Sequence, residues 1–474
     1  MSTPRIVVIG AGVTGLAAAL RLREHAPSTD VVVLEAAPRA GGTVATERSG
    51  GFVAEIGADS VITEKPWALA LAARHGFADR LIGTNETERR TYIVHAGRLH
   101  PLPEGFLMLA PTSLWPLAAS PLFTLGGKLR MGLDLLLPRG RDRGDESLAS
   151  FVRRRLGREA LERVADPLVG GIYTADPERL SLAASMPRFL DIERAHRSVI
   201  LGLRASATRA TRGAAGARYA LFVSHRDGMG GFVDEMVRRL PHGAVRLGTA
   251  AEAVERTDGG WRVRAGGETL PADSVILAVP AYAAAVLLRD LDAELARDLA
   301  SIDYASSATV TLGFRAADVR GKLTGFGFVV PHAEDRPLIA ATFSSRKYAG
   351  RAAPDFELLR AYVGGARRPE LVDRSDGELI DAVRGQLREL LGVAGEPVLA
   401  RVDRQRRAMP QYVVGHLDRV ATIERRTAAL PGLLLAGAAY RGVGIPDCIR
   451  GGEAAADTAL ERRPTHSSPN SSSG

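Results

Sequence analysis

The stretch that decides the fold is Arg5-Ile6-Val7-Val8-Ile9-Gly10-Ala11-Gly12-Val13-Thr14-Gly15. Its β-branched first half predicts a buried strand, and the residues that follow, 16–22, predict a helix. The first glycine permits a tight turn, the second lets a pyrophosphate approach the backbone, and the third lets the helix pack close to the strand. The helix N-terminus offers free N–H groups to the phosphates. The stretch therefore predicts a dinucleotide-binding turn.

Other strands extend this interpretation. Val31-Val32-Val33-Leu34 ends at Glu35, twenty residues after Gly15, where a carboxylate suits the ribose diol of a dinucleotide. Near the end of the chain, residues 433–437 predict a buried strand that ends in glycine, followed by a turn over 440–446 and a helix from Asp447 to Ala456. The segments 251–256, 260–263 and 273–280 predict strands that return to the same domain. We expect a discontinuous Rossmann-like domain.

Composition limits the class of protein. The chain has 474 residues, of which 46% are hydrophobic and 24% charged, as in ordinary globular proteins. Cys448 is the only cysteine, which excludes an internal disulfide and fits a reducing cytoplasm. The net charge of +8 favours acidic ligands, but nearly all of the 62 basic residues are arginines, so we expect no nucleic acid partner. The ten histidines show neither a hydrolytic triad pattern nor metal-ligand spacing, and we expect no metal.

The run after Glu35 separates the possible dinucleotides. Ala36-Ala37-Pro38-Arg39-Ala40-Gly41-Gly42-Thr43 resembles the extended fingerprint of the flavin amine oxidase superfamily, in which an arginine and a Gly-Gly pair pass beside the pyrophosphate and the flavin. The resemblance implies FAD. Cys448 lies inside the predicted final helix and is a poor candidate for a covalent link, so we expect the FAD to be non-covalent.

The chain up to about residue 458 is similar to the FAD-dependent porphyrinogen oxidases, which act on protoporphyrinogen IX or coproporphyrinogen III. The stretches that carry the likeness are 97–103, 170–177 with 180–182, 228–231, 325–331 and the final segment through Cys448. The resemblance implies an oxygen-dependent, six-electron oxidation of a porphyrinogen in haem biosynthesis, with hydride passing to flavin N5 and peroxide formed. It supplies no side-chain base, so we predict no catalytic side chain.

The resemblance also implies an α/β fold. The discontinuous Rossmann-like FAD-binding domain would carry an inserted α+β substrate-binding domain and a helical domain that could face a membrane. We predict the FAD-binding domain at 1–75, 213–290 and 413–460, the substrate-binding domain at 76–104 and 291–412, the helical domain at 105–212, and a disordered tail at 461–474.

The predicted cofactor contacts lie in the segments that resemble the family. They are Gly10, Ala11, Gly12, Val13, Thr14, Gly15, Glu35, Ala36, Arg39, Gly41, Gly42, Thr43, Gly57, Ala58, Asp59, Ser60, Val254, Gly437, Ala438, Val443, Gly444 and Ile445. This chain has Ala58-Asp59 where the family often has Gly-Pro, so we expect Ala58, Asp59 and Ser60 to act through their backbone.

A porphyrinogen has an apolar macrocycle and carboxylates at its rim, so its pocket should be apolar with a positive handle. Arg89 and Arg90 precede a predicted strand, 91–94, where the family binds a carboxylate, and a guanidinium fork suits that task. The alternative is two solvated loop arginines. The resemblance places Phe326, Gly327, Val329 and Tyr362 near the macrocycle, although Tyr362 fits a core position equally well. Ala175 stands where the family usually has glycine, and its methyl group could crowd the substrate.

The 23 residues between Glu104 and Lys128 carry no charge. Pro111, Pro116 and Pro121 argue against a membrane-spanning helix there, because hydrocarbon cannot replace the donors that prolines lack. Two explanations stay open: a buried wall of the substrate cavity, or a surface that dips into a membrane.

We expect a cytoplasmic protein, peripheral on the inner face of the cell membrane, that uses oxygen and a tetrapyrrole substrate. It would be a monomer or homodimer, with the next enzyme of the haem pathway, a chelatase, as a further partner. An amine oxidase, a carotenoid desaturase and a non-catalytic flavin-binding protein are the alternatives.

Overall fold

The computed structural model describes residues 4–86, 89–107, 109–140, 144–213, 221–319, 321 and 323–461. The chain divides into two compact units. The first, here called the cofactor unit, contains 1–42, 233–301 and 421–474, and the second, the sheet unit, contains 43–232 and 302–420. Helices α11 (Met229–Arg238) and α16 (His416–Ala428) carry the chain across these divisions. The predicted tail at 461–474 lies outside the described residues, except for Glu461.

The cofactor unit is built on a five-stranded sheet in which every neighbouring pair is parallel. In spatial order its strands are β12 (Val245–Arg246), β2 (Asp30–Leu34), β1 (Arg5–Ile9), β16 (Ser274–Leu277) and β22 (Leu433–Leu435). Parallel strands covered on both faces need continuous apolar runs, which the predicted strands supply. The segments at 251–263 instead form an antiparallel sheet of β13 (Ala251–Thr257), β14 (Gly260–Ala265) and β15 (Glu268–Ala272). Helices α12 (Ala281–Leu288) and α13 (Ala293–Ala300) complete the unit.

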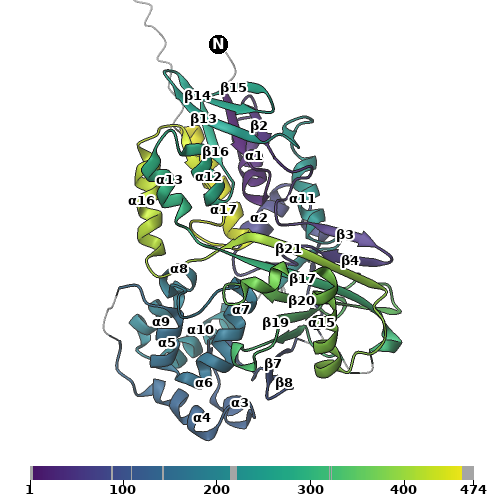
Figure 1. Ribbon diagram of the computed structural model, residues 1–474. Helices are drawn as coiled ribbons and strands as arrows, with labels where there is room; N and C mark the ends of the chain where they lie inside the picture. Colours follow the sequence, from purple (N-terminus) through teal and green to yellow (C-terminus); the bar gives the residue numbers. More distant parts are fainter. Residues whose placement is uncertain are drawn as a thin grey trace, which may run out of the picture. The chain divides into compact units, whose positions relative to one another are not determined.

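Two helices from opposite ends of the chain pack together in this unit (Figure 1). They are α1 (Val13–His25) and α17 (Ile445–Glu461). A Cβ at Gly452 would lie 2.2 Å from the Thr14 carbonyl oxygen, so only glycine permits this approach. Helix α17 begins two residues before the predicted Asp447, because Pro446 fits the first turn of a helix and does not end it.

The sheet unit contains a seven-stranded sheet. In spatial order its strands are β21 (Leu399–Pro410), β17 (Tyr304–Arg315), β20 (Phe356–Gly364), β19 (Leu338–Phe343), β18 (Gly327–Val329), β7 (Thr91–His95) and β8 (Arg98–Pro101). All neighbours are antiparallel except β18 and β7. One face packs an apolar core against α15 (Asp376–Leu391), with Phe328, Leu359 and Leu387 among its members. We call the other face the open face.

Short helices occupy much of residues 114–213 (Figure 1). They are α3 (Leu114–Ala119), α4 (Leu125–Gly132), α5 (Leu148–Arg155), α6 (Arg158–Ala160), α7 (Asp166–Tyr173), α8 (Leu182–Ser185), α9 (Pro187–His196) and α10 (Val199–Gly213). The unit also holds the helices α2 (Trp67–Arg74) and α14 (Ser344–Lys347). It contains two small hairpins, β3 (Thr46–Ser49) with β4 (Phe52–Glu55) and β9 (Phe106–Leu107) with β10 (Ala110–Pro111). A third small sheet has β11 (Phe222–His225) between β5 (Val61–Ile62) and β6 (Leu81–Gly83). Among the described residues, no helix is both long and apolar enough to cross a bilayer.

Candidate cofactor and substrate sites

The turn between β1 and α1 has the geometry that dinucleotide phosphates need. A Cβ at Gly10 would lie 2.6 Å from the Ala278 carbonyl oxygen, and one at Gly15 would lie 1.9 Å from the Gly10 carbonyl oxygen, so the protein itself requires both glycines. Gly12 differs, because nothing lies within 4 Å of a Cβ at that position and its φ of −67° suits any residue. The protein has no use of its own for a glycine at 12, whereas a phosphate at the α1 N-terminus needs that space.

Glu35 follows β2 at the same carboxyl edge of the parallel sheet. Its Oε2 accepts a hydrogen bond from the Ala11 backbone N–H at 2.8 Å, and its Oε1 accepts one from Ala37 at 2.9 Å. These bonds fix the carboxylate beside the glycine turn. Each oxygen keeps a further lone pair that a ribose hydroxyl can use.

The predicted Gly-Gly pair lies directly against this turn. The Gly41 N–H donates to the Ala11 carbonyl at 2.8 Å, and a Cβ at Gly42 would lie 3.5 Å from the Gly12 Cα. Arg39 donates from Nη2 to the Gly42 carbonyl at 2.7 Å, which holds its side chain over the same loop. Ala36 is exposed beside Glu35.

The last segment of the chain reaches the same edge. Gly437, just after β22, has a φ of +133°, and a Cβ there would lie 4.0 Å from Thr14 Oγ1. Helix α17 begins at Ile445. Ala438, Val443, Gly444 and Ile445 are partly exposed, whereas Val254 is buried in β13. The glycine turn, Glu35 and the last loop therefore gather at the carboxyl ends of the parallel strands, where such sheets bind nucleotides.

The remaining predicted cofactor contacts lie in the sheet unit. A Cβ at Gly57 would lie 1.9 Å from the Thr43 carbonyl oxygen, so these two residues are neighbours. The Asp59 side chain pairs with Lys347, with 2.9 Å between Nζ and Oδ2, and accepts a hydrogen bond from Ser60 Oγ at 2.6 Å. Burial alone would raise the pKa of Asp59, but the charges of Lys347 and Arg360 hold this pKa well below its ordinary value. The Asp59 side chain therefore has a charged partner of its own, in addition to the backbone role that we predicted.

The open face of the seven-stranded sheet carries three of the seven predicted substrate residues, Gly327, Val329 and Tyr362. Across the strands, Val329, Ala340, Tyr362 and Thr309 form one row. Gly327, Thr342, Arg360 and Thr311 form the next. Because alternate strand residues point to opposite faces, Gly327, Val329 and Tyr362 share the open face, while Phe328 belongs to the core.

Helix α7 packs on this face through a glycine. A Cβ at Gly171 would lie 3.5 Å from Val329 Cγ1 and 3.9 Å from the Ala340 Cβ. Gly171 is exposed, and it has no side chain that would cover these two residues. Small residues on both elements permit this close packing, and Val329 and Ala340 are buried beneath the helix.

The two predicted carboxylate-binding arginines lie next to Phe326. The Phe326 N–H donates to the Arg90 carbonyl at 2.7 Å, and the parallel pairing of β7 with β18 fixes this neighbourhood. Arg89 forms an ion pair with Glu86 at 3.4 Å, and both side chains are exposed. An exposed pair of this kind contributes about 0–1 kcal/mol, so Arg89 can exchange it for a substrate carboxylate. The Arg90 side chain is exposed as well.

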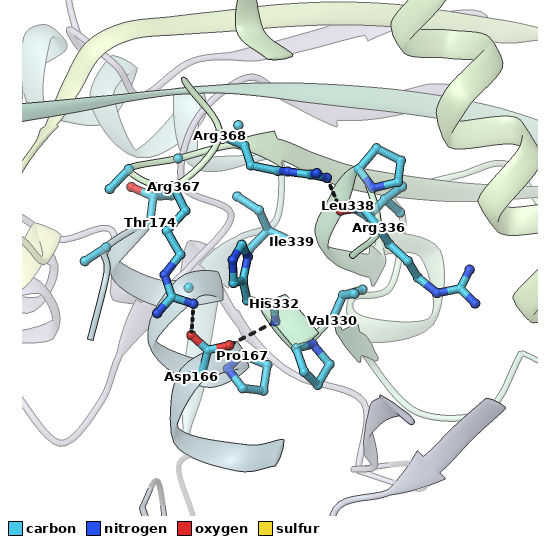
Figure 2. Close-up of a pocket in the computed structure, with 17 residues that line it drawn as sticks. Asp166, Pro167, Thr174, Val330, His332, Arg336, Leu338, Ile339, Arg367 and Arg368 are labelled. Carbon is cyan, nitrogen blue, oxygen red and sulfur yellow. Dashed lines mark hydrogen bonds and ion pairs between the residues drawn. The ribbon is translucent and has the colours of Figure 1, made fainter. Parts of the chain in front are cut away.

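Ala175 lines a separate cavity of about 60 Å³ behind α7, together with residues of β19 and of the loop after β20. Figure 2 shows Arg367 and the His332 backbone converging on Asp166, at 2.7 Å and 2.9 Å. Pockets for drug-sized ligands have volumes of about 300–1,000 Å³, so this cavity is too small for a tetrapyrrole.

The larger hollow beside this cavity, about 470 Å³, shares Asp166, His332 and Arg367 with it. Its arginines already have carboxylate partners: Arg153 pairs with Glu178, Arg158 with Glu162, and Arg367 with Asp166. Neither space therefore offers an unpaired cation to a carboxylate ligand. Burial raises the pKa of Asp166, although the charge of Arg367 opposes this shift.

A largely buried charged cluster of the sheet unit, to which the predicted Asp59 belongs, was missed by the sequence analysis. It consists of Glu55, Asp59, Lys347, Arg351 and Arg360, which are linked by ion pairs or electrostatic interactions. Arg360 interrupts the apolar run Leu358-Leu359-Arg360-Ala361 of a central strand. A charge in such a run was the available signal, because strands rarely bury an arginine without a specific partner.

We call the glycine turn, Glu35 and the loop after β22 the nucleotide cradle. Comparison with known proteins agrees with a nucleotide-binding role for it. Residues 13–460 match the model of a family described as flavin containing amine oxidoreductase. The chain belongs to this family. Its cofactor is FAD, as predicted, and the space over Gly12 with Glu35 beside it fits that group.

Two similar proteins and one solved structure are named as porphyrinogen oxidases. The chain is 35% identical to coproporphyrinogen III oxidase of Bacillus subtilis, covering 96% of this chain and 97% of that protein. It is 29% identical to protoporphyrinogen oxidase 1 of Arabidopsis thaliana, covering 97% of this chain and 88% of that protein. A solved structure from Exiguobacterium sp. 255-15, named provisionally as a protoporphyrinogen oxidase, superposes with a TM-score of 0.86 at 32% identity and covers 97% of this chain and 100% of that one.

The fold is also shared with more distant enzymes. Cyclohexylamine oxidase from Brevibacterium oxydans superposes with a TM-score of 0.69 at 16% identity over 97% of this chain and 99% of that one. At this identity the likeness concerns the fold alone.

Proposed function

We propose that this protein oxidises a porphyrinogen to the corresponding porphyrin in haem biosynthesis, with FAD as its cofactor, oxygen as the electron acceptor and coproporphyrinogen III as the preferred substrate. The observation that carries the proposal is similarity over almost the whole chain. Relatives named coproporphyrinogen III oxidase are 35% and 37% identical, against 29% for the Arabidopsis protoporphyrinogen oxidase.

FAD held by the glycine turn and Glu35 would supply hydride acceptance from the substrate and electron transfer to oxygen. The chain's own residues provide position and shape. Gly171, Gly327 and Val329 supply a flat apolar wall on the open face. Arg89 or Arg90 supplies a cation for a carboxylate at the rim of the macrocycle. Because none of these groups carries a proton to or from the substrate, their loss should affect binding more than the chemical step.

The proposal is tested by offering both porphyrinogens to the purified protein in separate reactions and recording porphyrin fluorescence and peroxide. We expect both reactions to proceed, with a higher kcat/KM for coproporphyrinogen III. Oxidation of amines with no oxidation of either porphyrinogen would refute the proposal and favour the amine oxidase alternative. Bound FAD without oxygen consumption on either substrate would favour a non-catalytic flavin protein.

We also propose that α3 and α4 bind the surface of an anionic membrane. Leu125, Leu129, Leu133 and Leu136 follow a spacing of four, four and three residues, which places them on one face of α4 and the turn after it. Their side chains and that of Trp115 are strongly exposed, at 74, 65, 46, 74 and 80%. The opposite face holds the fully buried Met131. This helix therefore turns an apolar stripe outward, which soluble surfaces rarely do.

The charges around this stripe favour a lipid surface. Lys128 and the exposed Arg139 flank it, while the nearby acidic residues are occupied: Asp134 is buried against Arg155, and Glu159 pairs with Arg163. A basic rim around an apolar stripe suits anionic headgroups above an acyl boundary. Within the uncharged segment before Lys128, Leu122 and Phe123 are buried, whereas Trp115 and Leu125 are exposed. The exposed residues support the membrane proposal.

A further inference from the structure

Arg360 of β20 is completely buried and largely without hydrogen-bond acceptors. Its exposed fraction is 0%. A guanidinium has five N–H donors. Nη2 donates to the Gly57 carbonyl at 2.8 Å, but Nε and Nη1 are buried with no hydrogen-bond partner. The ring of Tyr362, 5.3 Å from the guanidinium carbon, gives a cation–π contact but accepts no conventional hydrogen bond.

Arg351, in the same cluster, is also buried, but its guanidinium does have hydrogen-bond acceptors. It is 1% exposed. It donates from Nη2 to Ser224 Oγ at 2.7 Å and to the His225 carbonyl at 2.9 Å, and from Nη1 to the Arg226 carbonyl at 3.0 Å. It also lies 3.6 Å from the carboxylate of Glu55. Burying guanidinium N–H groups that have no acceptor lowers the stability of the fold, so the unpaired N–H groups of Arg360 require an explanation.

The charges around Arg360 do not compensate it. Among the described residues of the cluster, three cations (Lys347, Arg351 and Arg360) face two carboxylates (Glu55 and Asp59). Asp59 is engaged by Lys347 and Ser60, and Glu55 accepts hydrogen bonds from Thr46 and from the Met229 N–H. Burial also raises the pKa of Glu55, which favours its uncharged form. Asp227 also interacts with Arg351, but it is partly exposed and pairs with Arg48, so the cluster itself carries one more cation than it has carboxylates.

We propose that Arg360 is an anion-binding residue of the active site, and that one anionic oxygen acceptor completes its hydrogen bonding during the catalytic cycle. Arg360 shares the open face with Gly327 and Tyr362, which we predicted to lie near the substrate. The inference therefore rests on the proposed function. Two sources can supply this chemistry. One is a carboxylate of the porphyrinogen, and the other is the negative charge that the flavin ring gains on reduction.

The first arm of the test uses the FAD-loaded protein and the product porphyrin as a probe. We compare wild type, Arg360→Gln and Arg360→Lys for binding of coproporphyrin III and of its tetramethyl ester, by fluorescence quenching. If Arg360 receives a carboxylate, Arg360→Gln weakens binding of the free acid about ten- to a hundredfold and leaves the ester unchanged. Arg360→Lys should recover part of the loss, because it keeps the charge.

The second arm reads the flavin without the substrate. If Arg360 stabilises the reduced flavin, Arg360→Gln shifts the midpoint potential of bound FAD to a more negative value and weakens sulfite binding to the flavin, while porphyrin affinity stays the same. The control is Arg315→Gln, which removes an exposed cation at the end of β17 in the same sheet. This control should change neither readout.

The inference is overturned if Arg360→Gln retains FAD and changes neither the porphyrin affinities nor the flavin potential. It is also overturned if any change is matched by Arg315→Gln, since the effect would then be one of net charge. The flavin arm can be read even if the protein oxidises no porphyrinogen, so failure of the proposed function and failure of this inference are distinguishable.

Discussion

Gly171 of α7 lies against Val329 of β18, with 3.5 Å between the position of a Cβ at 171 and Val329 Cγ1. We predict that Gly171→Leu fills the surface that the macrocycle would use. Because the added side chain would occupy the place proposed for the macrocycle, the KM for the porphyrinogen should rise about tenfold or more, equivalent to a loss of about 1.4 kcal/mol or more in binding, with unchanged FAD content. Gly377→Leu in α15, where nothing lies within 4 Å of a Cβ, is the matched control. Wild-type KM in Gly171→Leu would remove α7 from the substrate site.

A leucine at position 12 should abolish flavin binding without unfolding the protein. Nothing lies within 4 Å of a Cβ at this position, and the backbone conformation accepts one. The cofactor does not tolerate it, because its pyrophosphate needs the same space. The measurement is the ratio of FAD to protein after purification, with circular dichroism to check folding. Gly385→Leu also meets nothing within 4 Å and should keep full FAD. A flavin-loaded Gly12→Leu variant would contradict the assignment of the turn.

Alanine at the true carboxylate-binding arginine should raise KM more than it lowers kcat. A charge-assisted hydrogen bond contributes roughly 1.5–3 kcal/mol, so we expect a ten- to hundredfold rise in KM for Arg89→Ala or Arg90→Ala, with unchanged FAD content. The double variant guards against one arginine replacing the other. Glu86→Gln frees Arg89 from its ion pair and should leave KM unchanged or lower it. If the double variant keeps wild-type KM, the carboxylates are bound elsewhere.

Lys347→Met should destabilise the protein in a pH-dependent way. In the wild type the pKa of Asp59 is depressed, so the pair stabilises the fold above about pH 4, and this contribution is lost as the pH falls through the folded pKa. Without Lys347, burial still opposes the ionisation of Asp59 and fewer groups favour it, so the pKa of Asp59 should rise and the loss of stability should grow as the pH rises from about 4 to 7. Breaking a buried pair costs about 3–5 kcal/mol, and Asp59→Asn with Lys347→Met should recover most of it. Thermal unfolding at both pH values is the measurement, and an equal loss at pH 4 and 7 would contradict the prediction.

The exposed leucines of α4 should control membrane binding. We expect the wild type to float with vesicles that contain phosphatidylglycerol at low salt, and Leu125→Ser with Leu129→Ser to stay at the bottom of the gradient. Val286→Ser removes an isolated exposed apolar side chain from α12 and should not change flotation. If the wild type never floats, the membrane proposal is wrong, and contact with another protein would then explain these exposed leucines.

Much of the nucleotide cradle could be predicted because its signals are local. The glycines, the strand before them and Glu35 fall within the first strand, turn, helix and strand of the chain, and their spacing sets the geometry. The start of α17 was two residues off, since a proline ends a helix or begins one according to its neighbours.

The substrate face could not be derived in the same way. Val329, Ala340, Tyr362 and Thr309 come from four strands, and no local pattern states that these strands are neighbours. The pairing of β7 with β18 joins residues that lie far apart in the sequence. Resemblance to a family placed Gly327, Val329 and Tyr362 near the substrate, but it did not show that Arg360 shares their face.

The packing of α1 against α17 has a consequence for how the protein is made. The glycine turn is synthesised long before α17, the helix that supports it, and before β22, the edge strand of the same sheet. The five-stranded sheet cannot be completed until β22 is available, because long-range pairings have to wait for both partners. We therefore expect FAD to bind only after β22 and α17 have been made, and nascent chains stalled before residue 433 should capture no FAD.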